Sequence, residues 1–449
     1  MLYIMRRLNY VLLLLSAIIL VSCQDDYGDI DNDLTDALKL ESQDGTIEYF
    51  VQPESNDLNS IPQDPKNILS TEKVKLGQLL FHETGLAENP KDMVSTGQYS
   101  CASCHQSKAG FQAGNAQGIG EGGIGFGHHG ESRTMYDQYA EDSCDVQPIK
   151  SPTVLNSAYQ TNMLWNGQFG STHVNVGTED AWTEGTPKAI NNLGFQGVET
   201  QAIAGLDVHR LMVNEELITK LGYKALFDDA FSDIAQADRY TKVTAGLAIA
   251  AYERTLMTTD APFQRWLKGD YAAMNVFAKK GALVFFGKGE CSTCHTGPAL
   301  NSMEFHAYGF NDLNDSPEAI LRRNSMASEN LGRGGFTGIE KDNYKFKVPQ
   351  LYNLAYLDFF GHGASMSTLR KVVEYKNTGI KENSNVPDKS LSPHFRALDL
   401  NNDELNTLIY FIEKALYDPS VDRYVPSGLP SGNCFPNADE VSMRDIGCE

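Results

Sequence analysis

The chain has 449 residues, of which 41% are hydrophobic and 21% charged, so it is long enough to bury one large core or two smaller ones. Lys and Arg number 37 against 58 Asp and Glu, which gives a formal net charge of −21 at pH 7. A surface this acidic repels a nucleic-acid backbone, so we expect no nucleic-acid partner.

Residues 1–22 have the pattern of a targeting segment. Arg6 and Arg7 precede an apolar run that is short for a membrane span and ends at Leu20-Val21-Ser22-Cys23. This ending is similar to the processing site of bacterial lipoproteins, where the cysteine is acylated and becomes the new N-terminus. We therefore predict a lipoprotein signal peptide at residues 1–22 and a lipid anchor at Cys23 as the only membrane contact. The expected location is the periplasm or cell envelope of a Gram-negative bacterium; an ordinary cleaved signal is the alternative.

The next segment is strongly acidic. From Gln24 to Pro65 there are twelve acids and one Lys, with little hydrophobic periodicity. This composition is typical of a solvated linker, so we predict an acidic tether over residues 23–60.

Two Cys-X-X-Cys-His motifs carry most of the functional information. They are Cys101-Ala102-Ser103-Cys104-His105 and Cys291-Ser292-Thr293-Cys294-His295. In this order, two thiols form thioethers with the vinyl groups of one porphyrin, and the adjacent imidazole ligates its iron. The alternatives are a zinc site, which normally needs further ligands, and a redox dithiol, which does not need the His. Two motifs predict two covalently bound haem c groups.

The two motifs lie in segments with matched features. Their first cysteines are 190 positions apart, Pro152 and Asn156 have the same spacing as Pro349 and Asn353, and Trp165 and His362 each follow the Asn by nine residues. These matches predict an internal duplication. We expect a mostly α-helical fold of two cytochrome-c-like domains, at residues 61–262 and 263–449, with long Gly-rich loops.

Local patterns agree with helical domains. Leu405, Leu408, Ile409 and Ile412 follow acidic residues at helical spacing, and residues 242–257 and 272–286 are further predicted helices. Eight glycines from Gly114 to Gly130 exclude regular structure and predict a long loop just after the first motif.

Several motifs together resemble the bacterial di-haem cytochrome c peroxidases and the related enzymes that mature methylamine dehydrogenase. The resemblance covers roughly Ile61 to Asp418. Besides the haem motifs it rests on Ser151-Pro152-Thr153-Val154-Leu155-Asn156, Leu164-Trp165-Asn166-Gly167, Ala250-Ala251-Tyr252-Glu253-Arg254-Thr255-Leu256, Cys294-His295-Thr296-Gly297-Pro298 and Phe346-Lys347-Val348-Pro349. It implies that the N-terminal haem reacts with peroxide and that the C-terminal haem receives electrons.

The resemblance also implies roles for individual residues. His105 and His295 are the expected proximal iron ligands, and Trp165 matches the tryptophan between the haems. Glu199 matches the distal glutamate, and a carboxyl group in an apolar haem pocket could carry the peroxide proton. A core tryptophan and a solvated surface glutamate are the alternatives. His128 or His129, in the Gly-rich loop, could be a distal ligand that must leave before peroxide binds.

The sequence departs from the family at the sixth ligand of the second haem. Lys376 stands where the family has Met or Tyr, and we predict it as the candidate axial ligand. A deprotonated amine can ligate iron. Tyr375 would need a shift of one residue to reach the same place, and Met366 is another alternative.

Two further departures concern the interface between the domains. In Pro349-Gln350-Leu351-Tyr352-Asn353, Tyr352 replaces the family arginine. Lys150, Leu357 and Phe359 stand at the family's calcium positions. We therefore consider calcium doubtful, because the Lys150 ammonium can supply the cation's charge.

Three cysteines remain. We predict a disulfide between Cys434 and Cys448, as suits an exported chain, and leave Cys144 as a free thiol or part of another pair.

Three functions are consistent with these features. The first is a peroxidase that reduces hydrogen peroxide with electrons from a small periplasmic donor protein, such as a cytochrome c or a cupredoxin. The second is an oxidase that modifies a partner protein, which would favour Tyr375 as the ligand. The third is an electron carrier with two six-coordinate haems, in which Glu199 would have no role.

Overall fold

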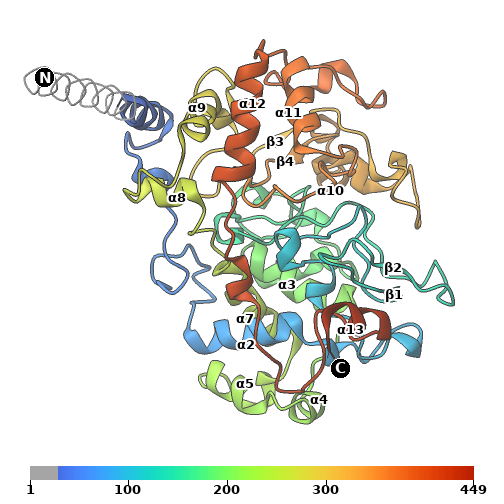
Figure 1. Ribbon diagram of the computed structural model, residues 1–449. Helices are drawn as coiled ribbons and strands as arrows, with labels where there is room; N and C mark the ends of the chain where they lie inside the picture. The colour runs from blue at the N-terminus through green and yellow to red at the C-terminus, as the bar shows by residue number, and fades with distance from the viewer. Residues whose placement is uncertain (1–28, 449) are drawn as a thin grey trace, which may run out of the picture.

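Figure 1 shows the computed structural model, which describes residues 29–448 and is mostly helical. Residues 29–41 are helical. The later helices are α2 (Thr71–His82), α3 (Gly197–Val208), α4 (Glu215–Lys220), α5 (Lys224–Ala230), α6 (Gln236–Arg239), α7 (Lys242–Arg254), α8 (Pro262–Leu267), α9 (Val276–Phe285), α10 (Arg333–Thr337), α11 (Leu369–Thr378), α12 (Asn402–Tyr410) and α13 (Glu440–Ile446). The predicted helices at 242–257 and 272–286 correspond to α7 and α9. The signal peptide and Cys23 lie outside the described residues.

The strands are short. They are β1 (Gly123–Ile124), β2 (Thr134–Met135), β3 (Phe305–His306) and β4 (Phe346–Lys347). β1 pairs with β2 and β3 with β4, both antiparallel, with Gly123 opposite Met135 and Phe305 opposite Lys347. The segment from Gly114 to Gly130 is otherwise irregular, as its glycine content requires.

Two helix pairs form the centres of two hydrophobic cores. α2 packs on α7, and α9 packs on α12. Each crossing depends on a glycine: a Cβ atom on Gly77 would lie 1.8 Å from the carbonyl oxygen of Ala248, and one on Gly281 would lie 1.9 Å from that of Thr407. Only glycine permits so close an approach of the two backbones. The same packing device therefore occurs in both halves of the chain.

The described part of the predicted tether is folded, which corrects that prediction for residues 29–60. The side chains of Leu34, Leu38 and Phe50 are buried in the second core, beside α8 and α9. Asp31 accepts a 2.7 Å hydrogen bond from the indole of Trp266 and pairs with Lys279. The hydrophobic residues of this segment, although sparse, are spaced at helical intervals and cover the outside of the second domain.

The C-terminal tail also departs from the predicted division at residue 263. After Leu416 the chain leaves the second core, and Val421 and Tyr424 pack into the first core. Figure 1 shows this red segment running from α12 to the half that contains α2 and α7, where α13 contacts β1. The N-terminal arm therefore packs on the second core, and the C-terminal tail packs on the first core.

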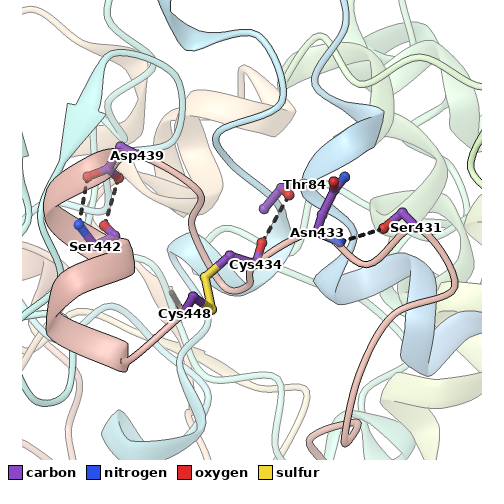
Figure 2. Close-up of a disulfide and its surroundings, with 7 residues drawn as sticks. All are labelled: Thr84, Ser431, Asn433, Cys434, Asp439, Ser442 and Cys448. Carbon is purple, nitrogen blue, oxygen red and sulfur yellow. Dashed lines mark hydrogen bonds between the residues drawn. A yellow bond between two sulfur atoms is a disulfide. The ribbon is translucent and has the colours of Figure 1, made fainter.

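The predicted disulfide between Cys434 and Cys448 is present and closes this tail (Figure 2). Thr84 donates to the carbonyl oxygen of Cys434 at 3.1 Å, which ties the tail to the end of α2. Asp439 accepts from Ser442 at the start of α13 and pairs with the buried Arg133. The tail thus contacts both the end of the Gly-rich loop, through Arg133, and the first core, through Thr84.

Within residues 29–448, no helix combines the length and the apolar character needed to cross a membrane.

Candidate haem-binding site

The first Cys-X-X-Cys-His motif forms a 3₁₀ turn at Cys101–Ser103 that leads into His105. The Nδ1 atom of His105 lies 3.2 Å from the carbonyl oxygen of Phe111, so we assign the ring proton to Nδ1, which leaves Nε2 free. Burial lowers the pKa of His105 to about 4. The imidazole is therefore neutral at pH 7, which is the form that ligates iron.

The second motif repeats this geometry. A 3₁₀ turn at Cys291–Thr293 leads into His295, whose Nδ1 lies 3.1 Å from the carbonyl oxygen of Leu300 and 3.0 Å from that of Pro349. Burial lowers the pKa of His295 to about 4 as well. Each motif thus presents one free imidazole nitrogen beside two cysteines.

The cysteines of the first motif do not have the properties of a redox dithiol. Among the described residues, Cys101, Cys104, Cys291 and Cys294 are free thiols. Burial raises the pKa of Cys101, Cys104 and Cys291 to about 12, whereas a reactive dithiol has a lowered pKa. Cys294 differs: burial raises its pKa, but the hydrogen bond and the charge of His306 outweigh burial and lower it. The first motif therefore suits thioether formation better than thiol–disulfide exchange.

Cys294 is also part of the one cluster of potential metal ligands found in residues 29–448. Its sulfur lies 3.6 Å from Nε2 of His306, and together with Glu304 these residues bring three ligand atoms within 4.8 Å of one another. A structural zinc site normally has four ligands, so this cluster is incomplete as a zinc site.

A cavity of about 270 Å³ opens beside the second motif. Cys291, Cys294 and His295 form one wall, and the remaining lining is largely apolar, including Val373, Leu408 and Ile412. An apolar cavity with two thiols and a neutral imidazole on one wall fits a covalently attached haem. The residues present therefore match the group that the sequence predicts.

Lys376, on α11, lines this cavity. Its ammonium nitrogen lies 2.9 Å from the centre of the Tyr308 ring, and desolvation lowers the pKa of Lys376 to about 7. Tyr375 points elsewhere, because its hydroxyl donates to the carbonyl oxygen of Tyr308 at 2.6 Å. Among the described residues, the lining of the cavity includes neither Tyr375 nor Met366. The geometry favours Lys376 over both alternatives.

Trp165 lies at the boundary between the two domains and lines the same cavity. Its indole nitrogen donates to the carbonyl oxygen of Lys150 at 2.8 Å, and the Lys347 amide donates to the Trp165 carbonyl oxygen at 2.7 Å. His362 is held by Asp312 at 3.0 Å and stacks on Phe346. These contacts fix the indole on the first-domain side of the cavity.

Glu199 is fully buried in the first turn of α3, so the solvated alternative is wrong. Its surroundings also differ from the expected apolar pocket. Arg254, at the end of α7, binds both carboxylate oxygens, with Nε–Oε1 at 2.7 Å and Nη2–Oε2 at 2.6 Å. The carboxyl group is therefore held by a bidentate pair with a cation and not enclosed by apolar groups alone.

The two loop histidines contact Glu131 and the first motif. The backbone amides of His128 and His129 donate to the Glu131 carboxylate. His128 is exposed, whereas the loop at His129 and Gly130 packs against Gly114 and the side chain of Gln106, the residue after His105. A distal role for either histidine stays a prediction.

Lys150 is buried, and its ammonium donates to the carbonyl oxygen of Ala113 at 3.2 Å. Desolvation lowers the pKa of Lys150 to about 8. Leu357 and Phe359, the other two residues at the expected calcium positions, line the haem cavity. At the one side-chain position of the expected site, the Lys150 ammonium supplies no oxygen ligand for Ca²⁺, so calcium stays doubtful.

Residues 71–272 match the family model of the di-haem cytochrome c peroxidases. This match and the relatives described next make the di-haem cytochrome c peroxidases the family that the chain is similar to. The match and the two motifs together mean two covalently bound haem c groups. The chain is 27% identical over 374 residues to the methylamine utilization protein MauG of Methylorubrum extorquens, covering 83% of this chain and 84% of that protein.

Other relatives are similarly distant. The chain is 27% identical over 380 residues to the cytochrome-c peroxidase IdrP1 of Denitromonas iodatirespirans, covering 80% of this chain and 86% of that protein. A crystal structure of a MauG-like protein associated with microbial copper homeostasis aligns with a TM-score of 0.55 and 20% identity, covering 83% and 96% of the two chains. The structural likeness concerns the fold alone.

Sequence analysis missed three residues at these sites. Arg254 neutralises Glu199, Tyr308 contacts the Lys376 ammonium, and Lys347 is a buried lysine that lines the cavity. Desolvation lowers the pKa of Lys347 to about 7, and its ammonium bonds the side chain of Gln160. Arg254 and Lys347 both lie in motifs that carried the family resemblance. A buried glutamate requires a cation as its partner, and this requirement is the signal that points to Arg254.

Proposed function

We propose that the protein is a peroxidase that reduces hydrogen peroxide to water with electrons from a small donor protein, a cytochrome c or a cupredoxin. The observation that carries the proposal is the repeated site geometry: two neutral, carbonyl-anchored imidazoles, His105 and His295, with Trp165 between the domains. The reaction consumes one peroxide, two electrons and two protons and releases two waters.

The chain's own residues support this division of labour. A haem iron with an open position supplies peroxide activation, and a second haem supplies electron entry. His105 and His295 would ligate the two haem irons through their free imidazole nitrogens. Glu199, paired with Arg254, is the candidate proton-transfer group in the first domain. Lys376 is the candidate sixth ligand at the second haem, where a nitrogen donor lowers the potential relative to Met.

Matched features in the two halves support an internal duplication. Gly77 and Gly281 occupy equivalent helix crossings, and Asn156 and Asn353 share the same positive φ of 57°. We also propose that the protein lies in the periplasm or cell envelope, anchored through Cys23. Because Lys150 already places an ammonium at the domain boundary, the proposal does not include calcium.

An oxidase that modifies a partner protein is the second candidate, since one relative is named for methylamine utilization. The hydrogen bond from the Tyr375 hydroxyl to Tyr308 favours the peroxidase, because it turns this tyrosine away from the cavity.

The deciding experiment compares two uses of peroxide by the purified di-haem protein. A reduced small cytochrome c or cupredoxin is mixed with the protein and peroxide, and donor oxidation is followed optically. A peroxidase oxidises two donor equivalents per peroxide with multiple turnovers. Absence of donor oxidation, together with peroxide-dependent modification of an added protein, would favour the oxidase instead.

A further inference from the structure

Two buried lysines at the domain boundary lack a carboxylate partner within residues 29–448. Lys150 and Lys347 are 3% and 6% exposed, and both line the cavity beside the second motif. The ammonium of Lys150 donates to the carbonyl oxygen of Ala113, and that of Lys347 donates to the side-chain oxygen of Gln160. Both acceptors are neutral. A buried ammonium without a counter-charge is costly, so these two groups require an anion.

The cavity wall does not supply that anion. Among the described residues, the carboxylates that line the cavity are Glu290 and Asp312, and each already has a partner. Glu290 pairs with Arg396 at 2.5 Å, and Asp312 lies 3.0 Å from Nε2 of His362. The counter-charge of the two lysines therefore has to come from the group that fills the cavity.

The position of both lysines is fixed by the backbone around Trp165. The Trp165 indole donates to the carbonyl oxygen of Lys150 at 2.8 Å, and the amide of Lys347 donates to the carbonyl oxygen of Trp165 at 2.7 Å. Cys291 and Cys294 line the same cavity. The two cations and the two attachment points of the second haem thus share one enclosed space.

We propose that Lys150 and Lys347 bind the two propionate groups of the haem attached at Cys291 and Cys294. Haem carries two propionates, which like other carboxylates are ionised at pH 7 and form strong charge-assisted hydrogen bonds with ammonium groups. Desolvation lowers the pKa of Lys150 to about 8 and that of Lys347 to about 7, and an adjacent propionate opposes this shift and keeps both lysines charged. The inference depends on the second haem but not on the peroxidase reaction.

The first test is a potentiometric titration of the second haem in the di-haem protein. Lys150→Met or Lys347→Met removes one cation and leaves a propionate charge uncompensated, which stabilises the ferric iron. Each variant should therefore lower the equilibrium constant for reduction by roughly tenfold, a midpoint potential about 59 mV lower. Lys345→Met is the matched control, because Lys345 pairs with Asp342 and lies outside the described lining of the cavity. The control should keep the wild-type potential.

The second test separates a contact with the propionates from a contact with the iron. In both Met variants the propionate bands of the resonance Raman spectrum should shift, while the near-infrared and EPR signals of iron ligation stay as in the wild type. Lys347→Arg keeps a cation and should keep the reduction equilibrium within about twofold of the wild type. An unchanged midpoint potential or unchanged propionate bands in the Met variants overturn the proposal. A changed ligation signal in Lys347→Met also overturns it, because that lysine would then ligate the iron.

A measurement on the wild type covers the case in which the Met variants fail to bind two haems. Exchange into D₂O replaces the ammonium hydrogens, so it should shift the propionate bands of the wild type. Propionate bands that do not respond to D₂O overturn the proposal.

Discussion

The indole of Trp165 lies edge-on to the imidazole of His362, with the ring centroids 6.4 Å apart and the planes at 69°. Each ring follows, by nine residues, an asparagine with positive φ, Asn156 or Asn353. The backbone of Lys150 joins them, because its carbonyl oxygen accepts from the indole and its amide donates to the His362 carbonyl oxygen at 2.9 Å. The corresponding rings of the two halves therefore meet at the domain boundary.

The Glu199→Gln variant should lower peroxidase turnover by roughly a hundredfold, the usual size of a lost acid–base group. It should also lower the free energy of unfolding by about 3–5 kcal/mol, because Arg254 is left as an unpaired buried charge. Arg254→Met is the matched control, since it breaks the same ion pair but keeps the carboxyl. Arg254→Met should therefore lower stability by a similar amount. Turnover of Glu199→Gln equal to that of the wild type, measured at full haem content, would show that Glu199 has no acid–base role.

Lys376→Ala should change the near-infrared and EPR spectra of the second haem and leave those of the first unchanged. The reason is that the amine, whose pKa burial lowers to about 7, is available as a neutral ligand inside the cavity. Tyr375→Phe is the control and should leave both spectra unaltered, since its hydroxyl is bonded to Tyr308. If Lys376→Ala has no spectral effect, the lysine is not the ligand.

Replacing both Cys434 and Cys448 by Ser should destabilise the tail by about 3 kcal/mol, because the disulfide closes a loop of 14 residues. Differential scanning calorimetry should show the loss as a lower Tm. A thiol reductant should lower the Tm of the wild type toward that of the double variant. An unchanged Tm in the variant would mean that the bonds of Thr84 and Asp439 hold the tail without the disulfide.

Phe50→Ala should lower the free energy of unfolding by about 3–5 kcal/mol. Phe50 is fully buried in the second core, and its ring contacts that of Phe286 at 5.2 Å between centroids. Leu40→Ala, at an exposed position of the same arm, should change stability by less than about 0.5 kcal/mol. Chemical denaturation of both variants distinguishes a folded arm from an unstructured tether. In a tether, the two substitutions would change the free energy of unfolding equally.

Local patterns made part of this architecture predictable from the sequence. The haem motifs need only neighbouring residues, and helices α7, α9 and α12 follow from hydrophobic spacing and local start and stop signals. The disulfide between Cys434 and Cys448 also joins residues that are close in sequence.

Contacts between distant segments were not predictable in this way. The acidic residues of the arm indicated a tether, but Asp31 pairs with Lys279 and Leu34 is buried against the second domain. The ion pair of Glu199 with Arg254 depends on how α3 packs against α7, which no local pattern specifies. The packing of Tyr424 into the first core likewise depends on a contact between distant segments, which no local pattern specifies.

The central claim is that one of the two haems reacts with peroxide while the other delivers electrons. The most direct measurement is the spectrum of the half-reduced protein, optical and EPR, before and after one equivalent of peroxide. Peroxide should alter the signal of the haem attached at Cys101 and Cys104, and the haem next to Lys376 should become oxidised. If peroxide leaves both signals unchanged, the protein is an electron carrier and not a peroxidase.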